Sequence, residues 1–113
     1  MSIFKTLFGS STQQNKSIQV LAPADFKAQT EKKNVQLIDV RSAGEFKSGH
    51  IKRAKNIDFF SGTFTEEFRK LDKEKAVYLY CRSGARSKQS SKKIAAMGFT
   101  EIYDLKGGIL NYK

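Results

Sequence analysis

Cysteine, histidine and proline each occur only once among the 113 residues of the sequence. A single cysteine excludes an internal disulfide, a Cys-x-x-Cys redox pair and a zinc site built from cysteines, and it is typical of a reducing compartment. One histidine and one cysteine cannot complete a zinc site either. We therefore expect no metal and no other cofactor, and we expect a cytoplasmic protein.

Long hydrophobic runs are also missing, and no segment approaches the length of a membrane-spanning helix. Four apolar residues near the N-terminus are spaced as on one face of a short helix: Ile3, Phe4, Leu7 and Phe8. Their pattern is too broken for a signal peptide, and no cleavage site follows it. We interpret residues 1–16 as a loose N-terminal arm and residues 17–113 as the folded domain. The alternative is that the arm is a helix that binds a membrane surface or a partner.

Acidic residues are scarce beside basic ones: 11 Asp and Glu stand against 21 Lys and Arg, which gives a formal net charge of +10. Such a balance is compatible with nucleic acid, an anionic membrane or a small anionic substrate as partner. The lysines are spread along the chain with only short pairs such as Lys32-Lys33, and no basic block of the nucleic-acid type occurs. We expect a small anion and no nucleic acid.

Strand patterns and helix patterns alternate along the chain, which is long enough for one compact domain. The expected strands are residues 17–21, 35–40, 54–57, 76–80 and 101–104. The expected helices are residues 23–32, 42–49, 63–71 and 87–97, followed by a closing turn at 109–112. Ser42 with Glu45, and Thr63 with Glu66, match capping boxes at the starts of two of these helices. The alternation implies an α/β fold with a parallel sheet covered on both faces.

The only cysteine, Cys81, follows the apolar residues 77–80 directly and precedes a short turn and a helix. A loop that curls at a helix start points several backbone amides at one spot and makes an anion site. Arg82 and Arg86 add positive charge, which favours a thiolate. The alternative is a buried, inert cysteine, but the two arginines and Gly84 do not suit a purely apolar environment. We take Cys81 as the candidate nucleophile.

The run Cys81-Arg82-Ser83-Gly84-Ala85-Arg86-Ser87 resembles the active-site loop of the rhodanese sulfurtransferase family. An upstream set of short blocks resembles the family's first signature: Leu37-Ile38-Asp39-Val40-Arg41, Glu45-Phe46, Gly49-His50-Ile51, Ala54 and Asn56-Ile57. A downstream set resembles its C-terminal signature: Gly98-Phe99, Tyr103-Asp104-Leu105 and Gly107-Gly108-Ile109. The match runs from about residue 35 to Tyr112, which stands where the family usually has tryptophan. The resemblance implies a three-layer fold with a central, mostly parallel five-stranded sheet and helices on both faces.

The activity that this resemblance implies is that of a thiosulfate sulfurtransferase. The Cys81 thiolate would take the outer sulfur of thiosulfate or a similar anionic donor, and sulfite would leave. The resulting persulfide would pass its sulfur to cyanide, to a low-molecular-weight thiol or to a protein thiol, so that the kinetics are ping-pong. Nothing in the sequence indicates an oligomer, and we expect a monomer.

The resemblance also assigns roles to the residues that follow the nucleophile. Arg82 is expected to attract the dianionic donor and to stabilise the departing sulfite. Backbone amides of the loop are expected to stabilise the persulfide anion, as in an oxyanion hole. These substrate-binding residues are Arg82, Ser83, Gly84, Ala85, Arg86 and Ser87, and Ser87 is also the expected helix cap.

Arg86 and three residues outside the loop receive supporting roles. Arg86 is expected to point back into the protein and to pair with a carboxylate such as Asp39, which fixes the shape of the loop. Asp39 and Arg41 are expected to support the loop from the end of a neighbouring strand. The only histidine, His50, suggests a Cys–His dyad, but the family uses no histidine base, and we expect a structural hydrogen bond instead.

Two other functions compete with sulfur transfer. Cys-based phosphatases and arsenate reductases share this fold and a Cys…Arg loop, but their loop is one residue longer than the four residues between Cys81 and Arg86. The shorter ring suits a single persulfide sulfur better than a tetrahedral phosphate, and resolving cysteines for arsenate reduction are missing. A module that only relays sulfur between proteins is the remaining alternative.

Overall fold

The computed structural model describes residues 16–32 and 34–112. Its elements are β1 (Ile18–Leu21), α2 (Pro23–Thr30), β2 (Gln36–Asp39), α3 (Ala43–Lys47), β3 (Lys55–Asn56), α4 (Phe64–Arg69), β4 (Val77–Tyr80), α5 (Ala85–Ala96), β5 (Ile102–Leu105) and the 3-10 turn η1 (Ile109–Asn111). The predicted alternation of strands and helices is confirmed. The predicted arm at residues 1–16 lies almost entirely outside the described residues, and the division of the chain at this point stays a prediction.

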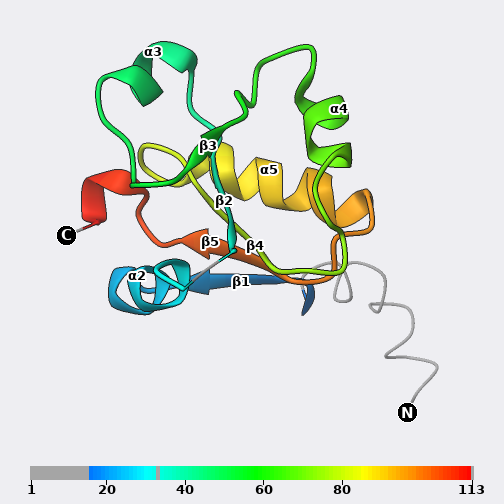
Figure 1. Ribbon diagram of the computed structural model, residues 1–113, viewed down its shortest axis with the longest axis horizontal. Helices are drawn as coiled ribbons and strands as arrows, with labels where there is room; N and C mark the ends of the chain where they lie inside the picture. Colours follow the sequence, from blue (N-terminus) through cyan, green and yellow to red (C-terminus); the bar gives the residue numbers. More distant parts are fainter. Residues whose placement is uncertain (1–15, 33, 113) are drawn as a thin grey trace.

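The five strands form one sheet in the order β1-β5-β4-β2-β3 (Figure 1). All of its pairings are parallel, where the sequence predicted a mostly parallel sheet. In a parallel sheet every strand ends at the same edge, and ligands bind beyond that edge. The loop after β4, which contains Cys81, therefore emerges where a binding site is expected.

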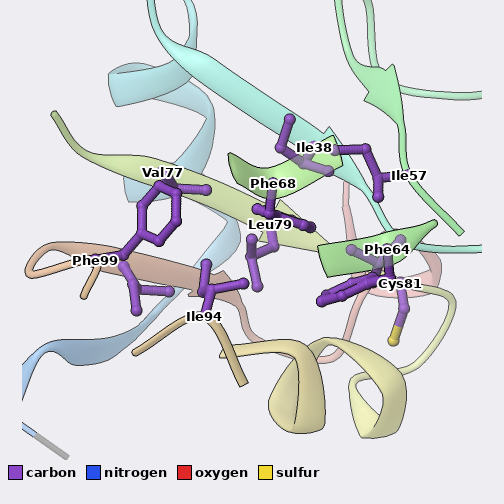
Figure 2. Packing of buried hydrophobic residues seen from close by; sticks show 11 residues of the cluster. Ile38, Ile57, Phe64, Phe68, Val77, Leu79, Cys81, Ile94 and Phe99 are labelled. Atoms are coloured by element: carbon purple, nitrogen blue, oxygen red, sulfur yellow. The ribbon is translucent and has the colours of Figure 1, made fainter. Parts of the chain in front are cut away.

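Successive side chains of a strand point to opposite faces of the sheet, so the strands bury two apolar layers. On one face, α4 and α5 cover a cluster made of Ile38, Val40, Ile57, Phe64, Phe68, Val77, Leu79, Cys81, Ile94, Phe99 and Ile102 (Figure 2). On the other face, α2 covers a smaller cluster made of Phe26, Leu37, Ile51, Tyr78, Tyr80 and Leu105. The predicted three-layer arrangement is confirmed. In the described part of the chain, no helix is long and apolar enough to cross a membrane.

One of the two predicted capping boxes is present. The Ser42 hydroxyl accepts a hydrogen bond from the Glu45 amide (3.3 Å), and the Glu45 carboxylate accepts one from the Ser42 amide (3.0 Å). The second prediction is wrong, because Thr63 makes no side-chain cap at the start of α4. Its hydroxyl instead donates to the carboxylate of Glu67 at 2.9 Å.

Helix α5 begins at Ala85, earlier than the predicted start at Ser87. The N-cap residue is Gly84, which has a φ of 118° and makes no side-chain cap hydrogen bond. A backbone in this region is accessible to glycine at little steric cost. The prediction that Ser87 caps the helix is therefore wrong: Ser87 lies inside the first turn, buried against the sheet.

Candidate active site

Cys81 follows the last residue of β4 and faces the same side of the sheet as α5. It is buried, with 1% of its surface exposed. Its sulfur lies at one end of the core cluster and points toward α5 (Figure 2). The backbone amide of Gly84 donates to Sγ at 3.1 Å, and Sγ lies 3.5 Å from the Ser87 hydroxyl oxygen. Two polar groups from the start of α5 thus meet the candidate nucleophile.

The remaining loop residues differ in exposure. Arg82, Ser83 and Ala85 are exposed, whereas Arg86 is half-buried. The predicted role of Arg82 in attracting an anionic donor stays a prediction, with which its exposure to solvent is consistent. The predicted convergence of further loop amides on the sulfur stays a prediction, because the sulfur's amide partner in the described residues is Gly84 alone.

The loop rests on the turn that follows β5. The Ile109 amide donates to the Cys81 carbonyl (2.9 Å), and the Leu110 amide donates to the Arg82 carbonyl (3.2 Å). Gly108 has a φ of 68°, and a Cβ there would clash with the Arg82 carbonyl. Sequence reasoning did not assign this supporting role, although the paired glycines preceding Ile109 are the signal that could have revealed it.

Arg86 pairs with Glu45 of α3, and the predicted pair with Asp39 is wrong. The Arg86 guanidinium donates to both Glu45 oxygens, at 2.7 Å and 3.0 Å. This bidentate contact, helped by the Ser42 groups of the capping box, lowers the pKa of Glu45 to about 2, against a cost from burial. Arg86 also lies close enough to Cys81 for their charges to interact. The pair therefore ties the first turn of α5 to α3.

Asp39 cannot reach Arg86 because its side chain lies on the opposite face of the sheet from Cys81. Asp39 pairs in register with Tyr80, whose ring belongs to the cluster under α2. The Asp39 carboxylate is fully buried and is satisfied by Arg41, with the shortest contact at 2.7 Å. Arg41 also donates to the Gly49 carbonyl at 2.6 Å, so the pair joins the end of β2 to the segment after α3.

His50 lies on the surface and contacts α3. Its Nδ1 is 2.8 Å from the Phe46 carbonyl, and its ring stacks on the Phe46 ring at a centroid distance of 3.7 Å. This is the structural hydrogen bond that the sequence predicted. Within residues 16–32 and 34–112, no three His, Cys, Asp or Glu side chains gather as metal ligands do.

The fold and the placement of the single cysteine define a known class of domain. The family model described as "Rhodanese-like domain" matches residues 22–113. The chain therefore belongs to the rhodanese-like family, and this membership supports a cysteine-based enzyme.

Relatives by sequence include a protein of similar length and proteins that are much longer. The chain is 36% identical over 102 residues to the uncharacterized protein YqhL of Bacillus subtilis, covering 90% of this chain and 78% of YqhL. It is 38% identical over 95 residues to the tRNA uridine(34) hydroxylase of Cytophaga hutchinsonii, covering 81% of this chain and 30% of that relative. The chain thus spans less than a third of this hydroxylase.

A solved structure shows the same fold. The rhodanese-like domain protein of Staphylococcus aureus superposes with a TM-score of 0.74 and 26% sequence identity, covering 84% of this chain and 91% of that chain.

Proposed function

We propose that this protein is a sulfurtransferase that moves sulfane sulfur from thiosulfate, or a similar anionic donor, to a thiophilic acceptor through a persulfide on Cys81. The observation that carries the proposal is the setting of the sulfur, which meets the Gly84 amide at 3.1 Å and the Ser87 hydroxyl at 3.5 Å. Four residues separate Cys81 from Arg86, the basic residue at the end of the loop. An ion pair with Glu45 holds the Arg86 side chain in place.

In the first half of the reaction, the Cys81 thiolate attacks the outer sulfur of thiosulfate. The sulfur–sulfur bond of the donor breaks, and sulfite leaves with the bonding electron pair. The Arg82 guanidinium, exposed beside the nucleophile, attracts the dianion and stabilises the leaving sulfite. The Gly84 amide donates to the sulfur anion, as oxyanion-hole groups do for oxygen. The Ser87 hydroxyl oxygen lies 3.5 Å from the sulfur and donates its own proton to the Gly84 carbonyl.

In the second half, the acceptor attacks the outer persulfide sulfur and the Cys81 thiolate is regenerated. Cyanide or a thiol serves as the acceptor. A protein thiol is the second candidate acceptor, and one observation favours it. The tRNA uridine(34) hydroxylases match this chain over only a minor part of their length, so a segment similar to this chain also occurs within larger proteins, where an acceptor thiol could belong to the same or a bound protein.

A kinetic experiment tests the proposal. With thiosulfate and cyanide varied against each other, we expect parallel double-reciprocal lines, the pattern of a ping-pong reaction. Hydrolysis of p-nitrophenyl phosphate should be negligible, because a ring with four residues between Cys81 and Arg86 leaves too little room for the extra phosphate oxygens. Faster phosphatase than sulfurtransferase turnover would replace the proposal with the phosphatase function.

A further inference from the structure

A cavity of about 370 Å³ lies between α5 and the β1 edge of the sheet. Its volume is within the range of small-molecule binding sites, about 300–1,000 Å³. Its walls come from β1, from the end of β5 and from α5. Neither Cys81 nor Arg82 lines it, so the proposed sulfur transfer does not account for this cavity.

The sheet side of the cavity is mostly apolar. Ile18 and Val20 of β1 and Leu105 of β5 line it. Val20 has 60% of its surface exposed, which is unusual for a large apolar side chain of this fold. Apolar walls with a few well-placed polar groups are the usual lining of a ligand site. An apolar part of a ligand would therefore find contact area on β1.

One buried carboxylate, that of Asp104 in β5, stands among these apolar walls. Asp104 is in register with Val20 of β1 and Leu79 of β4, so its side chain points to the face of the sheet that α5 covers. It lines the cavity with only 5% of its surface exposed, and its Oδ1 has no hydrogen-bond partner among the described residues. A buried polar atom without a partner is costly and uncommon in native structures. The carboxylate therefore lacks a donor that a ligand in the cavity would supply.

Three lysines line the same cavity. Lys88 and Lys92 lie one turn apart on α5, and Lys106 follows β5 directly. All three are exposed, and among the described side chains none of them forms an ion pair with Asp104. The cavity thus presents charges of both signs that do not neutralise each other in a direct contact.

This arrangement disfavours a simple ion of either sign. A ligand with only negative charge would be repelled by Asp104, and a ligand with only positive charge would be repelled by the lysines. We propose that the cavity binds a small zwitterion, an amino acid with an apolar side chain. Its ammonium group would face Asp104, its carboxylate would face the lysines, and its side chain would pack on Ile18 and Val20. The inference goes beyond the proposed function and does not depend on it.

Titration of the protein with L-leucine, followed by the NMR shifts of the backbone amides, tests the inference. We expect saturable shifts at Val20, Leu105 and Gly107, and none in α4, which contributes nothing to the cavity. Two analogues separate the charges, since N-acetyl-L-leucine lacks the ammonium group and L-leucinamide lacks the carboxylate. Each should bind about tenfold more weakly than leucine, because each loses a charge-assisted hydrogen bond.

Variants assign each charge to its partner. Asp104→Asn should bind leucine about tenfold more weakly and should no longer distinguish it from N-acetyl-L-leucine. Lys88→Ala combined with Lys92→Ala should instead reduce the preference for leucine over leucinamide. Lys47→Ala, an exposed position of α3 outside the cavity, is the control and should bind leucine as the wild type does. If Asp104→Asn failed to fold, the lysine variants and the two analogues would still decide.

The absence of shifts at the cavity residues with leucine at about 10 mM, where even a millimolar site is mostly filled, would overturn the inference. Equal binding of leucine and either analogue would also overturn it, because the site would then not require both charges. None of these measurements involves Cys81 or a sulfur donor, so their result is independent of the test of sulfur transfer.

Discussion

At the scale of single residues, Cys81 has contacts that a thiol in a purely apolar core would not have. Its surroundings in the cluster are apolar, yet its sulfur meets the Gly84 amide and lies beside the Ser87 hydroxyl. In the proposed reaction, the Gly84 amide would stabilise the sulfur anion without a histidine base. His50 is engaged with Phe46 on the surface and plays no part in this arrangement.

Arg82→Ala should raise the KM for thiosulfate and weaken the salt dependence of the reaction. The exposed guanidinium supplies charge that attracts the dianion, and one charge-assisted contact contributes about 1.5–3 kcal/mol in favourable cases. Steady-state kinetics at several ionic strengths measure the effect, with Arg69→Ala on the exposed end of α4 as control. Equal changes in the two variants would show that Arg82 does not face the donor.

At the scale of elements, three segments hold the active loop: the start of α5, helix α3 and the turn after β5. Arg86 and Glu45 join the first two, and the amides of Ile109 and Leu110 join the loop to the third. Figure 1 shows this turn, in red, next to the loop that leads into α5. The loop geometry is therefore set by contacts between segments far apart in the sequence.

Gly108→Ala should impair sulfur transfer more than it impairs folding. The new Cβ would lie 2.7 Å from the Ser83 amide nitrogen and even closer to the Arg82 carbonyl, so the loop must move. The left-handed backbone adds strain of about 1–3 kcal/mol. Gly44→Ala is the control, because a Cβ there meets nothing within 4 Å. Turnover and melting temperature measure the two effects, and full activity in the Gly108 variant would contradict this account of the loop.

Glu45→Gln should weaken the tie between α3 and α5 while keeping the capping box, since glutamine also serves at that position. The Glu45 pKa is lowered from 4.5 to about 2, so its stabilising effect is present above pH 4.5 and is lost as the pH falls through about 2. Both side chains are partly exposed, so the loss at pH 7 should be at most about 1 kcal/mol. Urea unfolding at pH 7 and at pH 2 measures it. If Glu45→Gln lowered the free energy of unfolding equally at pH 7 and at pH 2, the ion pair with Arg86 would not be the source of the loss.

At the scale of the whole molecule, Asp104 makes the stability of the fold depend on pH. Its folded pKa of about 6 lies above the ordinary 3.8, so the folded state loses stability as the pH rises from about 4 to 6. This difference corresponds to at most about 3 kcal/mol. Asp104→Asn should therefore increase the free energy of unfolding at pH 7 relative to the wild type, and should change it little at pH 3. If Asp104→Asn were less stable than the wild type at pH 7, the claim that a buried, ionised Asp104 destabilises the fold would be contradicted.

Much of the architecture could be predicted because it depends on local patterns. Apolar runs such as residues 77–80, followed directly by Cys81 and a turn, identify the strand and the loop at its end. The partner of Arg86 could not be predicted, since it depends on the face to which Asp39 points. The cap of α5 was misplaced because the sequence alone does not show that Gly84 takes a positive φ.

The most direct test of the central claim is the intact mass of the protein after incubation with thiosulfate. The account predicts a gain of one sulfur atom on Cys81, removed by cyanide or dithiothreitol and absent from Cys81→Ser. The substitution should preserve the fold, because hydroxyl and thiol differ little in volume. No mass gain in the folded wild-type protein, or a gain that persists in Cys81→Ser, would contradict the account.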